Sequence, residues 1–222
     1  AALLLPALHN ARSLARNLHC MSNQRQVVLA TTLYAEDHDG WGHASRYVEM
    51  PGVGHAIGQQ VLIGFGYLPE HTWRPPAGFY VNTNPRLGYP CSEYGHYQPE
   101  TSYGIGTGGF CVNRFVSFVY HGGTDTLSYP DNNPTHLHRV TSVPNAAEFV
   151  LWADYSGAGS IHHWWALYPE AAPGDTMGWF YRHNRGLNLG FADGHVTRFT
   201  EARLAAGEPA DQWTSFYPWD NY

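Results

Sequence analysis

The C-terminal segment RHNRGLNLGFADGHVTRF, residues 182–199, places two histidines near an aspartate. His183 lies ten positions before Asp193, and His195 directly follows Gly194. Imidazole and carboxylate groups can form acid–base pairs or bind a metal ion. However, alternating apolar residues flank the Asp-Gly pair, which is typical of a β-hairpin with a two-residue turn. The turn alone explains Asp193 and Gly194, because both residue types tolerate a positive φ.

A two-residue type I′ turn would pair Phe191 with Val196 and Gly190 with Thr197. One face of this hairpin is then apolar and carries Leu187, Leu189, Phe191 and Val196. We expect that face to pack against an N-terminal helix. We also expect His183 to tie the start of the hairpin to a neighbouring group, either Asp154 or a backbone carbonyl.

The remaining candidate ligands do not form a recognisable metal motif. They are His162, His163, His183, His195, Asp154 and Asp193. Adjacent histidines point to opposite faces of a strand, so they cannot easily bind one ion. The sequence also contains no H-E-x-x-H motif. A transition-metal site is therefore not favoured.

The segment EDHDG, residues 36–40, offers three hard oxygen ligands for calcium: Glu36, Asp37 and Asp39. The full D-x-D-x-D-G loop is missing. Acidic groups at the C-terminal end of a helix are mildly opposed by the helix dipole, which favours a nearby cation. Calcium is therefore the one candidate cofactor, and the alternative is a solvated helix end.

No feature of the sequence favours an enzyme. It contains no G-x-S-x-G motif, and YSGAGS around Ser156 is typical of a flexible turn. A glycosidase-type carboxylate pair has no fixed sequence spacing, so that alternative stays open. The abundant Trp and Tyr rings could stack on sugars, or they could fill the core.

The composition narrows the partners and the compartment. The chain has 222 residues and a net charge of −6, and its 12 basic residues are all arginine, without a basic cluster. A nucleic-acid partner is therefore not expected. There is no C-x-x-C motif, but Cys91 and Cys111 could form a disulfide in an oxidising compartment, which would leave Cys20 unpaired.

The elements that position these residues begin with a long helix. Apolar residues recur at helical spacing up to a predicted end near residues 37–40; they are Leu4, Leu8, Ala11, Ala15, Leu18, Leu29 and Leu33. About 35 helical residues span about 50 Å, so part of the helix should project from the globule. We expect Pro6 to kink or interrupt it.

Short strands and long Pro/Gly-rich loops follow the helix. Segments 110–120 and 148–156 are rich in aromatic and β-branched residues, which predicts strands. Segment 55–68 fits a short helix or turns, and segment 160–169 fits a strand or a loop. The predicted fold class is α+β: a long N-terminal helix, residues 1–40, packed against an antiparallel sheet with long loops in residues 41–222.

Both ends of the chain resemble one protein family. HNRGLNLGFADGHV, with nine residues between His183 and Asp193-Gly194, resembles the closing motif of type IV pilin-like proteins related to the major pseudopilins of type II secretion. The N-terminal segment is similar to the family's signature helix, including Cys20-x-x-Asn23 and the acidic end before Gly40. Segments 101–106 and 148–156 resemble its middle blocks.

This resemblance implies a non-enzymatic structural subunit of an extracellular or cell-surface filament or pseudopilus. Copies of the chain would assemble through the helix, whose packing residues would be Leu3, Leu4, Leu5, Leu8, Ala11, Leu14 and Leu18. Family members carry a longer apolar segment upstream, which would provide any membrane contact and which this sequence lacks. The alternative is a monomeric envelope module that binds carbohydrate through exposed Trp and Tyr.

Overall fold

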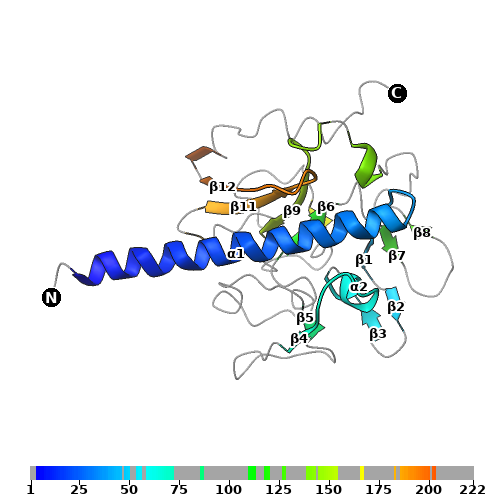
Figure 1. Ribbon diagram of the computed structural model, residues 1–222, viewed down its shortest axis with the longest axis horizontal. Helices are drawn as coiled ribbons and strands as arrows, with labels where there is room; N and C mark the ends of the chain where they lie inside the picture. Colours follow the sequence, from blue (N-terminus) through cyan, green and yellow to red (C-terminus); the bar gives the residue numbers. More distant parts are fainter. Residues whose placement is uncertain are drawn as a thin grey trace.

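The structure consists of one long helix lying across a small β-sheet (Figure 1). The computed structural model of the chain describes residues 4–46, 48–50, 54–56, 59–72, 86–87, 110–113, 118–120, 127–128, 139–143, 145–154, 166–167, 183, 186–200 and 202–203. A helix and a sheet that follow one another along the chain confirm the predicted α+β class.

Helix α1 runs without a break from Leu4–Asp37. Its N-terminal part extends past the edge of the sheet, as predicted (Figure 1). The predicted kink at Pro6 is wrong, because Pro6 lies in the first turn, where its missing N–H needs no partner within the helix. Among the described residues, no helix is both long enough and apolar enough to cross a membrane.

The C-terminal end of α1 is closed by a glycine, also as predicted. The Gly40 N–H donates to the Ala35 carbonyl at 2.8 Å, and the His38 N–H donates to the same carbonyl at 3.1 Å. Asp39 and Gly40 both have positive φ, 53° and 85°. This conformation turns the chain away from the helix axis and provides donors for a carbonyl that would otherwise lack one.

The central sheet has five strands in the order β10-β6-β9-β11-β12. They are β6 (Phe110–Asn113), β9 (Val150–Asp154), β10 (Ala166–Leu167), β11 (Gly186–Phe191) and β12 (Val196–Thr200). Three neighbouring pairs are antiparallel, as predicted, but β10 runs parallel to β6. The predicted strand at 148–156 contains β9, and segment 160–169, for which a strand or a loop was expected, contains β10. The single strand predicted at 110–120 is two strands, of which only β6 belongs to this sheet.

Smaller elements lie beside the central sheet. A second sheet has the order β1-β7-β8, with β1 (Ala44–Arg46), β7 (Phe118–Tyr120) and β8 (Leu127–Ser128). Two-stranded pairs join β2 (Val48–Met50) to β3 (Gly54–Ala56) and β4 (His71–Thr72) to β5 (Arg86–Leu87). Segment 55–68 contains helix α2 (Gln59–Gly64), and a 3-10 turn, η3, spans Val140–Ser142.

The register of the C-terminal hairpin differs from the prediction by one residue. Gly190 lies opposite Val196, and Leu187 lies opposite Phe199. In the predicted register Gly190 would have faced Thr197. Because side chains alternate along a strand, this shift brings Phe199 to the same face as Leu187, where the prediction had separated them.

The reason is a turn that is one residue longer than expected. The Gly194 N–H donates to the Phe191 carbonyl, and the Phe191 N–H donates to the His195 carbonyl, both at 2.9 Å. Gly194 has φ 94°, whereas Asp193 does not adopt a positive φ. This is the three-residue turn with a glycine bulge, rather than type I′. Asp193 stabilises it by accepting the His195 N–H at 3.0 Å.

The helix packs on the opposite face of the hairpin from the one predicted. A Cβ added at Gly190 would lie 2.7 Å from Val28 Cγ2, so the Gly190 face meets α1. Trp152, which pairs with Gly190, donates its indole N–H to Thr31 Oγ1 at 2.9 Å. Leu187 and Leu189 are fully buried on the other face. Glycine allows the closest approach of helix to strand, which explains the choice of face.

The two sides of α1 are chemically different. The side buried on the sheet carries small or polar residues, namely Cys20, Gln24, Val27, Val28, Thr31 and Ala35. The exposed side carries Leu8, Leu14, Leu18, Leu29 and Leu33. At about 100° per residue, these leucines fall within about 120° of the circumference, opposite the buried side. The helix therefore does not use its leucine stripe, these five residues, in its own core.

We predict that Gly190→Ala destabilises the fold by about 1–3 kcal/mol, because the added methyl group overlaps Val28. Urea denaturation of the purified chain measures the change. In a Val28→Ala background the same substitution should cost clearly less. An equal cost in both backgrounds would mean that the helix does not press on this strand.

Candidate functional site

His183 stands at the entry of the hairpin, where three backbone contacts hold it. Its N–H donates to the Gly186 carbonyl at 3.1 Å. Its own carbonyl accepts two hydrogen bonds from Arg198, from Nε at 3.1 Å and from Nη2 at 2.6 Å. Gly186 allows this arrangement, because a Cβ there would lie 2.8 Å from Arg198 Nε. The planar guanidinium thus clamps the loop that carries the imidazole.

The side chain of His183 reaches Asp154, as predicted. Its Nε2 lies 3.6 Å from Asp154 Oδ2, and both side chains are almost fully buried. The same carboxylate oxygen accepts the backbone N–H of Asn188 at 2.6 Å. Asp154 at the end of β9 therefore links the hairpin entry to the middle of β11. Sequence reasoning offered Asp154 as one of two partners for His183, the other being a backbone carbonyl.

Cys20 completes the cluster from the helix. Its thiol donates to Asp154 Oδ1 at 3.7 Å, and the residue is fully buried. The sulfur, one imidazole nitrogen of His183 and a carboxylate oxygen of Asp154 all lie within 4.8 Å of one another. Three elements distant in sequence therefore meet at one point. Sequence analysis missed Cys20 as a member, although it shares a helical face with Gln24 and Val27.

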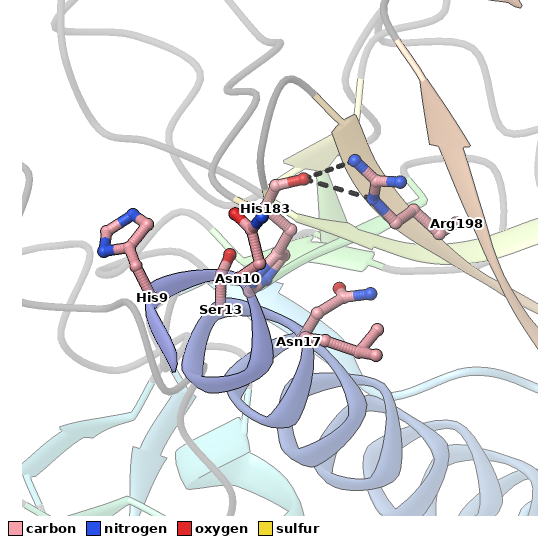
Figure 2. A pocket seen from close by; sticks show the side chains of 7 residues that line it. His9, Asn10, Ser13, Asn17, His183 and Arg198 are labelled. Carbon is pink, nitrogen blue, oxygen red and sulfur yellow. Dashed lines mark hydrogen bonds between the residues drawn. The ribbon is translucent and has the colours of Figure 1, made fainter. Parts of the chain in front are cut away.

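A polar pocket of about 140 Å³ adjoins this cluster. It lies between the projecting part of α1 and the hairpin entry (Figure 2). Its lining includes both His183 and Arg198, together with the helix residues His9, Asn10, Ser13, Leu14 and Asn17. The pocket therefore provides a route from solvent towards the imidazole.

The order of groups in the cluster does not match a nucleophilic site. In a Cys–His site the imidazole contacts the sulfur and the acid orients the imidazole. Here the carboxylate of Asp154 lies between the two, since it contacts the thiol through Oδ1 and the imidazole through Oδ2. The cluster is suited to holding three elements together or to binding an ion.

The other predicted ligands do not join the cluster. His195 Nδ1 contacts Asp193 Oδ1 at 2.6 Å, but this pair lies exposed at the tip of the hairpin. His195 also stacks on Phe191, with ring centroids 4.1 Å apart. His162 and His163 lie outside the described residues.

The predicted calcium ligands do not form one cluster. Asp37 Oδ2 accepts a hydrogen bond from the Tyr67 hydroxyl at 2.8 Å, and this bond raises the pKa of Tyr67. Burial raises the pKa of Tyr34, which packs beside Tyr67. In the described part of the chain, only Cys20, Asp154 and His183 gather as a potential ligand set. Calcium binding at Glu36, Asp37 and Asp39 stays a prediction without geometric support.

Two other predicted features are only partly described. Cys91 lies outside the described residues, and Cys111 is described only as part of the backbone of β6. Two of the predicted packing residues of the helix cannot be compared: Leu3 lies outside the described residues, and Leu4 is described only as part of the helix backbone. The remaining packing residues are exposed: Leu5, Leu8, Ala11, Leu14 and Leu18.

Comparison of the chain with models of known protein families, with curated proteins and with solved structures found no significant match.

The two His–Asp pairs give a matched test of the buried cluster. We predict that His183→Ala lowers the free energy of unfolding by about 1–3 kcal/mol, because it removes one buried partner of the Asp154 carboxyl group. His195→Ala should cost only about 0–1 kcal/mol, since that pair is exposed. Denaturant unfolding measures both variants. Equal losses would rule out a structural role specific to His183.

Proposed function

We propose that this chain is a structural subunit of an extracellular, pilin-like filament that assembles through α1. The observation that carries the proposal is the leucine stripe. Leu14, Leu18 and Leu33 each expose more than half of their surface, at 59%, 56% and 58%. Leu18 and Leu33 lie on the side of α1 that faces away from the sheet, and Leu14 lies at the edge of the stripe, where it also lines the pocket beside His183.

The energetics favour a partner for this stripe. Fully burying one leucine side chain contributes about 1.5–3 kcal/mol. Single exposed leucines are ordinary, but several on one side of a helix favour an interaction surface. Between Leu18 and Leu29 the same side carries the exposed polar residues Ser22, Arg25 and Gln26, so the stripe has two apolar parts. Helices with such stripes bury them against one another at interaxial distances of about 8–10 Å. A second copy of α1 supplies a surface of the same kind.

The direction of the stripe supports a filament over a closed dimer. The N-terminal part of α1 carries Leu8 and Leu14 of the stripe, and the part on the sheet carries Leu29 and Leu33. Contact between the projecting part of one copy and the covered part of the next is head-to-tail. Such a contact repeats without closing when its rotation does not complete a ring. The sheet would then lie on the outside of the filament.

The carbohydrate-binding alternative gains no support from the described aromatic residues. Trp152 is fully buried, and its indole N–H is bonded to Thr31. The Arg139 guanidinium lies over the ring of Trp41, 5.2 Å from its centroid. Tyr34 of α1 and Tyr67 contact each other edge to face, and the Tyr67 hydroxyl is engaged by Asp37. Among the described residues the most exposed Phe, Tyr or Trp side chain is Phe65, at 48%, and it contacts Tyr34 edge to face. No set of exposed Trp and Tyr rings is described that would form a platform for sugar.

The test is assembly of the purified chain with two leucines of the stripe changed. We predict that Leu14→Asp with Leu18→Asp abolishes filaments seen by negative-stain electron microscopy, because each change places a charge in the contact. His9→Asp is the control, since His9 is exposed on the same helix and, at about 100° per residue, lies outside the arc of the stripe. Circular dichroism should show that all variants keep their helix.

Two results would contradict the proposal. The first is a monodisperse monomer under all conditions, even when an apolar helical segment is added before residue 1. The second is filaments of unchanged form and yield from the double leucine variant. Loss of filaments in His9→Asp as well would show that added charge alone prevents assembly.

A further inference from the structure

We propose that Cys20, Asp154 and His183 form a binding site for one divalent transition-metal ion of the zinc type. The three side chains come from α1, from the end of β9 and from the entry to the hairpin. This inference rests on the buried cluster alone and is independent of filament assembly.

The side chains are close enough for one tetrahedral ion after small rotations. Zinc bonds of about 2.0–2.3 Å at tetrahedral angles place neighbouring ligand atoms about 3.3–3.8 Å apart. The His183 Nε2 atom lies 3.6 Å from Asp154 Oδ2, and the Cys20 Sγ atom lies 3.7 Å from the other carboxylate oxygen, Oδ1. One ligand atom from each residue lies within 4.8 Å of the other two. Rotations that move the ligand atoms by about 1 Å would bring one atom of each residue onto the same ion.

The chemistry of the donors selects the metal. A thiolate and an imidazole are ligands of zinc and related transition metals, whereas calcium and magnesium take oxygen ligands. One thiolate from Cys20 and one carboxylate from Asp154 provide two negative charges. A divalent ion neutralises both, and burial makes such neutralisation important, because Cys20 and Asp154 are fully buried.

The surrounding contacts orient the ligands. The Asn188 N–H bonds to Asp154 Oδ2, which leaves Oδ1 directed towards Cys20. Arg198 clamps the carbonyl of His183 and so holds the loop that carries the imidazole. Supporting contacts of this kind are typical of protein metal sites.

The adjoining pocket supplies access and a fourth ligand. His183 forms part of its wall, so an ion can approach the imidazole from solvent through a polar opening (Figure 2). Three protein ligands with water in the fourth position are common at zinc sites that remain open to solvent. The bound ion would join α1 to the sheet and to the hairpin at one point.

Cobalt(II) is the direct probe, because it replaces zinc and reports on thiolate ligation. Under reducing conditions we expect one equivalent of Co²⁺ to produce a thiolate-to-cobalt charge-transfer band in the full 222-residue chain. Zn²⁺ should displace the cobalt and raise the melting temperature. In Cys20→Ser the band should disappear. Loss of an outer-shell partner lowers metal affinity by about 10- to 100-fold, and loss of the Cys20 ligand should lower the zinc affinity by more than that.

Two further variants make the outcome decisive. His195→Ala removes an exposed histidine that also contacts an aspartate, and it should bind cobalt as the unmodified chain does. Cys91→Ser with Cys111→Ser should keep the band, which assigns it to Cys20. If Cys20→Ser does not fold, His183→Gln tests the same site through the loss of affinity. Absence of the band in the unmodified chain, or its persistence in Cys20→Ser, would overturn the proposal.

Discussion

The packing of α1 on the central sheet determines both the buried cluster and the exposed leucine stripe. The side-chain amide of Gln24 donates to the carbonyls of Trp152 at 3.0 Å and Asn188 at 3.2 Å. It therefore bridges β9 and β11 from the helix. Gly190 allows Val28 to approach the same strands closely. A buried amide must be hydrogen-bonded, so these two carbonyls determine the rotation of the helix about its axis.

That rotation determines which residues are left for other partners. With Gln24 facing the sheet, Cys20 lies one turn earlier on the same side and meets Asp154. The leucine stripe lies on the opposite side and faces solvent. The buried cluster and the proposed filament surface are thus two consequences of one helix orientation.

Much of the secondary structure could be predicted from sequence. The length of α1, its end before Gly40, strand β9 and the existence of the hairpin are local properties, carried by apolar spacing and by glycine. Asp154 was one of the two partners predicted for His183, and the structure brings the two side chains together. The hairpin register was wrong, because Asp-Gly suits both a two-residue turn and a longer turn with a glycine bulge. The parallel pairing of β10 depends on long-range contacts that carry no local signal.

The amino-acid sequence by itself therefore determined a long helix with two chemically different sides, and a hairpin closed by glycine. Only the tertiary structure decided which side of the helix is buried. Apolar spacing favours burial of the leucines, but the close approach at Gly190 and the two carbonyls that accept from Gln24 stabilise the opposite orientation. The same decision brings Cys20 to Asp154 and His183, residues more than a hundred positions away, and no spacing within the sequence indicates that meeting.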